Sequence, residues 1–376
     1  MKLPFSWRRL LALCRKESLQ ILRDPSSHVM AFAMPVVLLL IFGYGINLDS
    51  TAIRVGLLLG ETSGEARRFA DGFFGSPYLR VRPMESREAL SRALTAGEIR
   101  GFVVVEEDFS SRLNRREETA PVQVVTDGAE PNVASFVENY SRGAWQLWLR
   151  QRASDLGRKL PPQIDIESRI WFNPAARSRY FLVPGSVTII MTVIGALLTS
   201  LVVAREWERG TMEALLASPA NRIEIVASKL LPYYVLGIVS FLVCIAVAVF
   251  VIGVPFRGSL PVLLLVSTLF LFSVMGMGLW VSTVLRNQFN AAMTTLNLAF
   301  LPAMMLSGFI YEIQSMPWPI RAVTYLVPAR YFVGSLQTLF LAGDVWPILI
   351  RNVLFLAGSS ALFIVLTYRA TRTRLD

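Results

Sequence analysis

The sequence predicts a polytopic α-helical membrane protein with six transmembrane helices and an α/β domain inserted between the first two spans. Hydrophobic residues make up 53% of the 376 residues and charged residues only 17%, and the mean hydropathy is +0.49. That balance is too apolar for an ordinary soluble protein. In addition, six segments are long and apolar enough to cross about 30 Å of hydrocarbon, which disfavours the alternative of core helices in a large soluble enzyme. These segments, with Arg351 as their only charged residue, are Val29–Leu48, Phe181–Ala204, Leu230–Val254, Leu260–Leu285, Ala291–Tyr311 and Pro347–Tyr368.

Residues 1–28 are predicted to form an amphipathic helix on the cytoplasmic side of the membrane. Helical spacing gathers apolar residues into one stripe. The basic residues expected on the opposite side are Arg8, Arg9, Arg15, Lys16 and Arg23. A basic helix of this kind lies in the headgroup plane, either as a plain anchor or as a mechanical element, and Asp24-Pro25-Ser26-Ser27 is expected to end it. The stripe consists of Trp7, Leu10, Leu11, Cys14, Ser18, Ile21 and Leu22.

The first span, residues 29–48, is predicted to be retained, because the segment before it and the apolar run itself are both too long for a cleaved signal peptide. A signal anchor is the rival interpretation. The residues before this span and the tail after the last span both carry a net positive charge. Six crossings leave both termini on one side of the membrane, and the positive-inside rule makes that side the cytoplasm.

Residues 49–178 have the composition of a soluble domain, with 19 basic and 18 acidic side chains between Asp49 and Arg179. This balance gives no support to nucleic-acid binding. Alternating strand and helix patterns predict an α/β domain outside the cytoplasm, in which Asp127-Gly128 is a turn rather than a catalytic acid. Strands are expected at Ile53–Leu59, Tyr78–Val81, Gly101–Val105, Val122–Thr126 and Ile164–Phe172, and helices around Glu65–Phe74, Ser86–Ala96, Asp108–Arg115 and Val133–Leu156.

A short cytoplasmic helix is predicted at about residues 211–217, between the second and third spans. Gly210 can end the membrane helix and Pro219 can stop the short one, with Thr211 as its cap. Apolar anchors on one face would suit docking into a groove on another protein, and a solvated turn between two spans is the alternative. The anchors are Met212, Leu215 and Leu216.

This segment resembles the coupling-helix signature of ABC-2-type transporter permeases, the membrane halves of ATP-driven exporters. The resemblance covers nearly the whole chain and is closest to the multidrug-efflux branch related to daunorubicin-resistance permeases. The residues that it implies for coupling to an ATPase are Arg205, Glu206, Glu208, Arg209, Gly210, Thr211, Met212, Glu213, Leu215 and Leu216. Further matching motifs are Arg23-Asp24-Pro25-Ser26-Ser27, Phe42-Gly43-Tyr44-Gly45, Trp171-Phe172-Asn173-Pro174, Arg286-Asn287-Gln288-Phe289-Asn290 and Leu306-Ser307-Gly308-Phe309-Ile310.

The resemblance also implies partners and a function. The chain would be a permease subunit in a bacterial inner membrane that exports amphipathic drugs or lipid-like compounds, paired with an identical or a sister permease. A separate P-loop ATPase would bind ATP and Mg²⁺, and a periplasmic adaptor and membrane lipids are further expected partners. None of the four lysines stands in a P-loop pattern, so this chain itself is expected to bind no cofactor.

Residues 179–376 are expected to form the remaining transmembrane domain, with a re-entrant hairpin at about residues 312–346. That segment is too apolar for a wet loop, and its prolines break it into pieces too short to span the membrane. The resemblance implies helices that cap the exit of the transport path. An interfacial cover with Trp318 and Trp346 as belt aromatics is the alternative.

The resemblance implies that the second and fifth spans line the translocation path. Their hydroxyl and amide groups, beside several methionines, suit a greasy and weakly polar cargo, although such side chains also join membrane helices. The path residues expected on this basis are Thr188, Thr192, Thr199, Thr294, Thr295, Asn297 and Ser307.

Two other function classes compete with an ATP-driven permease. An ion-driven secondary exporter needs carboxylates within the membrane, which the predicted spans lack, and a membrane sensor would need a cytoplasmic output domain. Catalysis by this chain is not expected, because its one histidine, His28, has no plausible partner and no metal-ligand spacing is present.

Overall fold

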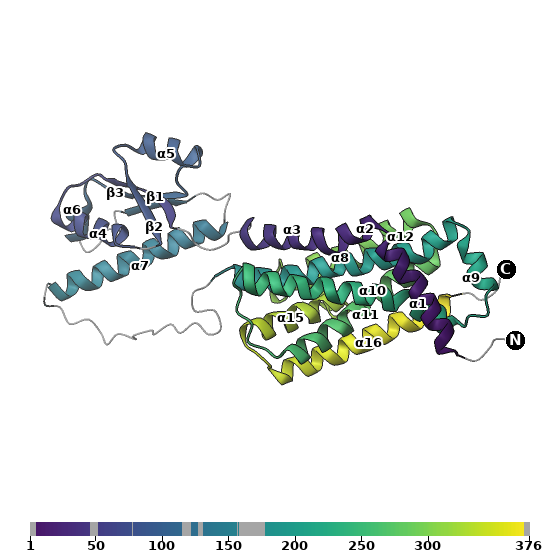
Figure 1. The fold of residues 1–376 in the computed structure, drawn as a ribbon. Helices are drawn as coiled ribbons and strands as arrows, with labels where there is room; N and C mark the ends of the chain where they lie inside the picture. Colours follow the sequence, from purple (N-terminus) through teal and green to yellow (C-terminus); the bar gives the residue numbers. More distant parts are fainter. Residues whose placement is uncertain are drawn as a thin grey trace. The chain divides into compact units, whose positions relative to one another are not determined.

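The computed structural model describes residues 5–45, 52–76, 78–114, 122–126, 131–155, 157 and 177–371. The chain divides into two compact units, which Figure 1 shows as a helical bundle and a mixed α/β unit. The bundle consists of Met1–Leu48 and Arg169–Asp376, and the α/β unit of Asp49–Ser168. Six helices among the described residues are long and apolar enough to span a membrane, the number that hydropathy predicted.

The first span follows the helix α1 (Trp7–Leu22) after a short break and runs continuously from Pro25 to Gly45. It begins at Pro25 rather than Val29 because the Asp24 side chain accepts a hydrogen bond from the Ser26 amide and Pro25 takes the first helical position. The residues expected to separate the two helices therefore start the span. Its parts are α2 (Pro25–His28), the π-helical η1 (Val29–Ala33), α3 (Met34–Leu40) and the π-helical η2 (Ile41–Gly45); residues 46–48 of the expected span lie outside the described residues.

The second span, α8 (Arg179–Glu208), is the central helix of the bundle. Of its most apolar stretch, 83% is buried, a larger share than in the other candidate spans. It packs against α10 (Arg222–Ala246), which continues as the π-helical η3 (Val247–Val251), and most extensively against α11 (Leu260–Leu285). A central position explains why α8 is apolar all round, since it has almost no face toward lipid or water.

Small and hydroxylated residues set the spacing between α8 and α11. Gly278 of α11 lies against the Ala196 carbonyl oxygen and the Thr199 hydroxyl of α8. One turn further, the Ser282 hydroxyl accepts hydrogen bonds from the amides of Val203 and Ala204, at 3.1 and 2.9 Å. Close approach through small residues is a common way to join membrane helices.

The fifth span consists of α12 (Gln288–Thr295), the π-helical η4 (Leu296–Phe300) and α13 (Leu301–Leu306). It was expected at Ala291–Tyr311, and both ends differ for local reasons. Asn287 caps the helix through the Asn290 amide, at 2.9 Å, and Gly308 leaves it with a φ of +86°. Hydropathy alone predicts neither the Asn287 cap nor the turn at Gly308.

Three short helices occupy the segment before the last span, α16 (Trp346–Ala370). They are the 3₁₀ turn η5 (Ile313–Ser315), α14 (Trp318–Thr324) and α15 (Pro328–Leu341). Both α14 and α15 start with proline in the first turn, and α15 packs against α8, α11 and α16. The prolines thus divide this segment as expected, and α15 is part of the bundle core.

The α/β unit is built on a four-stranded sheet in the order β2-β1-β3-β4. Its central strand β1 (Ile53–Leu59) pairs in parallel with β2 (Leu79–Pro83) and β3 (Gly101–Val105), and β4 (Val122–Thr126) is antiparallel to β3. Helices α4 (Gly64–Phe74), α6 (Phe109–Asn114) and α7 (Pro131–Asp155) lie on one face of the sheet, and α5 (Arg87–Thr95) covers the other (Figure 1). Aromatic side chains from α4, α6 and α7 form the core on their face. The strand expected at Ile164–Phe172 and the turn at Asp127-Gly128 lie outside the described residues.

Replacing Gly278 by alanine should destabilise the bundle, because a Cβ there overlaps Ala196 and Thr199 of the adjacent helix. Overpacking of this kind costs about 1–3 kcal/mol. Thermal unfolding of the detergent-solubilised chain would measure the effect. Gly358→Ala in α16 is the matched control, since its Cβ meets nothing within 4 Å; equal midpoints for the two variants would contradict the packing account.

Candidate functional site

The short helix α9 (Thr211–Ala217) joins the end of α8 to the start of α10. Gly210 has a φ of +69°, the left-handed conformation that lets the chain leave α8 without a Cβ penalty. Beyond α9, Asn221 and Glu224 form a capping box that starts α10. The helix occupies the residues that the glycine and proline signals predicted.

Each face of α9 has a different environment. Met212 is only 3% exposed and lies with Val203 of α8, Ile225 of α10 and Leu279 of α11 around a small apolar gap. Glu213, Ala214 and Ala217 are exposed, while Leu215 and Leu216 are half-buried. Of the three apolar anchors expected to face a partner, Met212 therefore fixes α9 to its own bundle.

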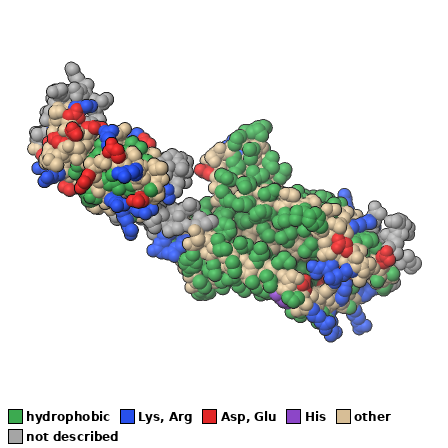
Figure 2. Space-filling model, turned by 90° about the horizontal axis from the view of Figure 1, so that it is seen from above, with side chains coloured by type: hydrophobic (Ala, Val, Ile, Leu, Met, Phe, Trp, Pro, Cys, Tyr) green, Lys and Arg blue, Asp and Glu red, His purple; other side chains and the backbone are tan. Residues whose placement is uncertain are grey.

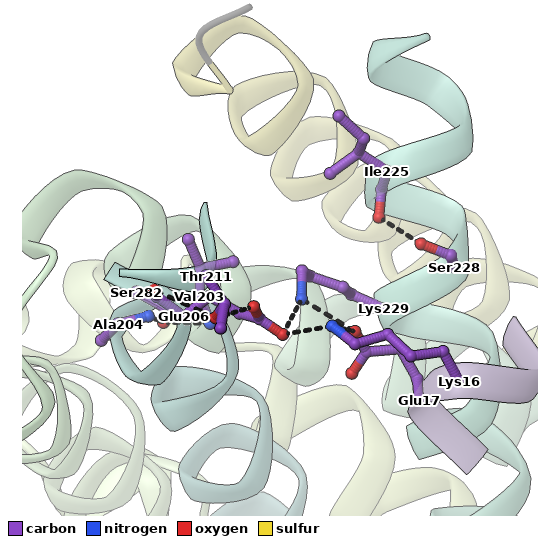
Figure 3. A network of polar contacts seen from close by, with 10 residues as sticks. All are labelled: Lys16, Glu17, Val203, Ala204, Glu206, Thr211, Ile225, Ser228, Lys229 and Ser282. Carbon is purple, nitrogen blue, oxygen red and sulfur yellow. Dashed lines mark hydrogen bonds and ion pairs between the residues drawn. The ribbon is translucent and has the colours of Figure 1, made fainter. Parts of the chain in front are cut away.

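A buried charge cluster lies beside the start of α9 (Figure 3). It contains two lysines and two glutamates, Lys16 and Glu17 from α1, Glu206 from α8 and Lys229 from α10. Lys229 Nζ reaches between two carboxylates, at 3.0 Å from Glu17 Oε1 and 3.5 Å from Glu206 Oε1. Lys16 Nζ closes the cluster at 2.7 Å from Glu206 Oε1 and 3.4 Å from Glu17 Oε1.

Because most of this cluster is buried, the pairing of its charges matters for the stability of the bundle. The Lys229, Glu17 and Glu206 side chains are 1%, 6% and 4% exposed, so an unpaired charge here would pay a large desolvation penalty. Two positive and two negative groups balance one another. The Thr211 hydroxyl of α9 donates a hydrogen bond to the Glu206 carboxylate, which brings the start of α9 into the same network.

A second set of contacts fixes both ends of α1 to the bundle. At its start, Glu224 of α10 accepts hydrogen bonds from Arg9 Nη2 at 2.8 Å and from the Ser6 amide at 2.6 Å. The pKa of Arg9 is raised by this carboxylate. Beyond its end, Arg205 of α8 lies 3.4 Å from Asp24. The helix is therefore attached to α8 and α10 along its whole length.

Asp24 combines capping with this ionic contact. Hydrogen bonds from Ser26, supported by Ser27 and by the charge of Arg205, lower its pKa from 3.8 to about 2 in spite of partial burial. Because the pKa in the folded state is below that in the unfolded state, the ionised carboxylate stabilises the fold at neutral pH. This contribution is lost as the pH falls from 3.8 toward 2.

Two contacts attach the end of α8 to the start of the fifth span. Glu208 accepts a hydrogen bond of 2.7 Å from the Gln288 amide, and the guanidinium of Arg286 lies 4.5 Å from the centre of the Trp207 ring. Arg209 is exposed and carries no recorded ion pair within the described structure. Of the ten residues expected to serve coupling, five therefore contact the rest of the chain through their side chains, namely Arg205, Glu206, Glu208, Thr211 and Met212.

The apolar stripe predicted for α1 divides between two surroundings. Leu10 and Ile21 are buried in the chain, at 5% and 6% exposure, and Cys14 is half-buried. Trp7, Leu11 and Leu22 stay 65–70% exposed. The stripe is wider than the contact with α10, so one edge stays exposed, and its placement in a lipid interface stays a prediction.

The residues expected along a translocation path are not brought to one surface. Thr188, Thr192 and Thr199 are buried within the bundle on α8, while Thr294 and Asn297 on the fifth span are exposed. Thr192 and Thr199 donate to carbonyls of their own helix, whereas the buried hydroxyls of Thr188 and Thr295 have no hydrogen-bond partner in the described structure. Ser307 is buried at the end of α13.

Sequence reasoning did not find the lysines and Glu17 of the charge cluster. Of the 37 basic residues, 33 are arginine and only four are lysine. The rarity of lysine was the available signal, since two of only four lysines meet in this cluster. A compact ammonium with three donors can bridge two carboxylates in a small space, where a planar guanidinium fits less well.

No group of three or more potential metal ligands occurs among the described residues. The His28 ring contacts the Leu22 carbonyl oxygen at 3.3 Å and stacks near Phe32. The interfacial position expected for His28 stays a prediction.

Comparison with known proteins identifies relatives over almost the full length. The family described as ABC-2 family transporter protein matches residues 26–369. The chain is 57% identical to the probable multidrug ABC transporter permease YbhS of Escherichia coli (strain K12), over 99% of this chain and 98% of the relative. It is 25% identical to YbhR of the same strain, also a probable multidrug ABC transporter permease, over 95% and 98%. It is 20% identical to the linearmycin resistance permease protein LnrN of Bacillus subtilis (strain 168), over 96% and 98%.

Lys229→Met should destabilise the bundle strongly, because it leaves Glu17 and Glu206 buried with only Lys16 to balance them. Breaking a buried pair from one side costs about 3–5 kcal/mol, measurable as a lower thermal midpoint in detergent. Arg82→Met is the control, since the Arg82–Glu98 pair is more than half exposed on both sides and costs at most about 1 kcal/mol. Adding Glu17→Gln to Lys229→Met should recover part of the loss; no recovery would exclude an ionic unit.

Proposed function

This chain belongs to the ABC-2 family of transporter permeases, and we propose that it exports amphipathic compounds with the energy of ATP hydrolysed in a separate subunit that docks on α9. As a member of this family, it is the membrane subunit of an ABC exporter and is not itself a nucleotide-binding enzyme. The family also implies an ATPase partner. ATP and Mg²⁺ would be bound by that partner.

The environment of α9 supports its role as the docking element. Its inner face is fixed by Met212 and by the Thr211–Glu206 contact, while Glu213, Ala214 and Ala217 stay exposed. A short, rigidly held helix with a free outer face can receive a push and pass it to the elements that hold it. The buried charge cluster would carry that push to α1, α8 and α10, which meet there.

Support for an amphipathic cargo comes from the relatives and from the fifth span. Two relatives are named as probable multidrug permeases and another as a linearmycin resistance permease. On this chain, Met293, Thr294, Asn297 and Met305 form an exposed, uncharged surface on the fifth span. Flexible thioethers beside hydroxyl and amide groups suit cargo of varied shape and weak polarity.

A second permease would complete this surface. The first and fifth spans each have only 22% of their most apolar stretch buried, the smallest share among the candidate spans, so they leave apolar surface free for another membrane helix. The proposed path lies between the two permeases, with the hydroxyls of Thr188 and Thr295 available after a rearrangement of α8. Whether the second subunit is identical or a sister chain is decided by the same purification that tests α9.

The chain is a multi-pass membrane protein, and we place it in a bacterial inner membrane with both termini in the cytoplasm. Helix α1 and the C-terminal ends of α8 and α16 carry arginine residues, in agreement with the positive-inside rule. The α/β unit then lies outside the cytoplasm, where a periplasmic adaptor would have access to it.

Glu213→Arg/Ala217→Arg should abolish co-purification of the ATPase and ATP-driven dye export from reconstituted vesicles. Both residues are exposed, so the thermal midpoint of the permease should be unchanged. Glu88→Arg/Ala96→Arg makes the same charge changes at exposed positions of the α/β unit and should leave both readouts intact. Export that continues without ATPase and stops when the proton gradient is collapsed would instead establish an ion-driven exporter.

Membrane topology can be tested with single cysteines in a Cys14→Ser/Cys244→Ala background, which removes the two native thiols. A membrane-impermeant maleimide should label an exposed Glu107→Cys variant in intact spheroplasts and label Ala217→Cys only after permeabilisation. The reverse pattern would invert the proposed orientation.

A further inference from the structure

A basic cavity of about 890 Å³ opens beside α1, at the same end of the bundle as α9. Its walls come from α1, the start of the first span, the end of α8 and the start of α12. Five basic side chains line it against a single acid, Asp24, and the basic residues are Arg15, Lys16, Arg23, Arg205 and Arg209.

These basic side chains fall into two groups. Lys16 is held by Glu206, and Arg205 lies 3.4 Å from Asp24. Arg15, Arg23 and Arg209 are exposed, and the described structure records no ion pair for any of them. Gln20 adds a side-chain oxygen that is buried without a hydrogen-bond partner in the described residues, and turning its amide would direct NH₂ donors to the cavity. The cavity thus has an unbalanced positive charge.

The position of the cavity in the bundle sets its depth in a membrane. The first span begins at Pro25, α8 ends at Glu208 and α12 begins at Gln288, so three spans end around it. The ends of apolar spans lie at the level of lipid headgroups. Within two helical turns of these ends, Val29, Phe289 and Met293 are 58%, 68% and 44% exposed. Figure 2 shows the same pattern, with Lys and Arg side chains gathered at this end of the bundle beside its apolar surface.

We propose that this cavity binds the phosphate-bearing headgroup of an anionic membrane lipid, with the acyl chains along the apolar sides of the first and fifth spans. Basic pockets at the cytoplasmic ends of membrane helices are suited to such headgroups. Guanidinium groups bind phosphate through paired N–H donors. A lipid fits better than a soluble anion, because apolar surface adjoins the basic walls. The inference rests on the proposed orientation, in which this end of the bundle faces the cytoplasm, and does not depend on the exported cargo.

The bound lipid would add a further link between α1 and the end of α8, which the protein already connects through Lys16–Glu206 and Asp24–Arg205. Arg15 and Arg23 belong to α1 and its end, whereas Arg209 belongs to the end of α8. One phosphate between them would neutralise repulsion among these groups. It would also hold α1 against α8 next to the buried charge cluster, so the anionic lipid content of the membrane would affect how firmly α9 is supported.

Native mass spectrometry of the full-length, delipidated chain tests this site with phosphatidylglycerol and phosphatidylcholine as probes. The wild type should retain phosphatidylglycerol in preference to phosphatidylcholine. Arg15→Gln/Arg23→Gln should weaken phosphatidylglycerol binding about 10- to 30-fold, since each basic residue near an anionic lipid contributes about 1 kcal/mol. Arg8→Gln/Arg369→Gln removes the same charge from exposed residues outside the cavity and should bind like the wild type.

A variant that is expected to bind the lipid more tightly makes the test independent of damage to the fold. Asp24→Asn removes the one acid of the cavity and releases Arg205, so phosphatidylglycerol should bind more tightly. Equal binding by wild type and Arg15→Gln/Arg23→Gln would overturn the proposal. Complete displacement of the lipid by millimolar inorganic phosphate would also overturn it and would indicate a site for a free anion. Loss of the ATPase from Arg15→Gln/Arg23→Gln with unchanged lipid binding would overturn it as well and would indicate that an acidic protein surface binds the cavity.

Discussion

The constraint on which this site depends is the cost of placing charge where a membrane helix meets water. Lys229, Glu17 and Glu206 are nearly inaccessible to solvent, so each must find its partner within the chain. The partners come from α1, α8 and α10, elements far apart in the sequence. Pairing these charges therefore fixes how three elements meet, and the Thr211–Glu206 contact adds α9 to the arrangement. A neutral cluster gives a defined geometry without a net charge at the membrane end.

The sequence predicts the bundle well because hydropathy is a local property. Six apolar runs correspond to the six candidate spans, and Gly210 and Pro219 give the limits of α9. The errors lie at helix ends, because single capping side chains set where a helix begins or ends. Asp24 and Asn287 start spans earlier than the apolar runs do, because each caps a helix with polar or proline residues in its first turn. Average hydropathy gives no weight to such a capping bond.

The functional residues were harder to predict, because their roles depend on contacts between distant elements. Amphipathic periodicity identifies the stripe on α1 but not the division between Leu10, which α10 covers, and Leu11, which stays exposed. Hydroxyl-bearing residues on α8 have the same sequence signature whether they line a path or fill a core. Only the central position of α8, which arises from its packing against α10, α11 and α15, separates these cases. In the described conformation it assigns Thr188, Thr192 and Thr199 to the interior.

The basic residues around α1 thus form two layers with different physical consequences. In the inner layer, Lys16 and Lys229 meet equal acidic charge, and the burial of Lys229, Glu17 and Glu206 keeps salt and solvent from weakening the contacts between these three. In the outer layer, Arg15, Arg23 and Arg209 face an open cavity with an excess of positive charge. The inner layer holds the elements in one arrangement whatever the surroundings, whereas the outer layer responds to the anions that the membrane supplies. Lys16 belongs to both layers, so an anion in the cavity acts on a side chain that also holds Glu206, the residue to which α9 is attached.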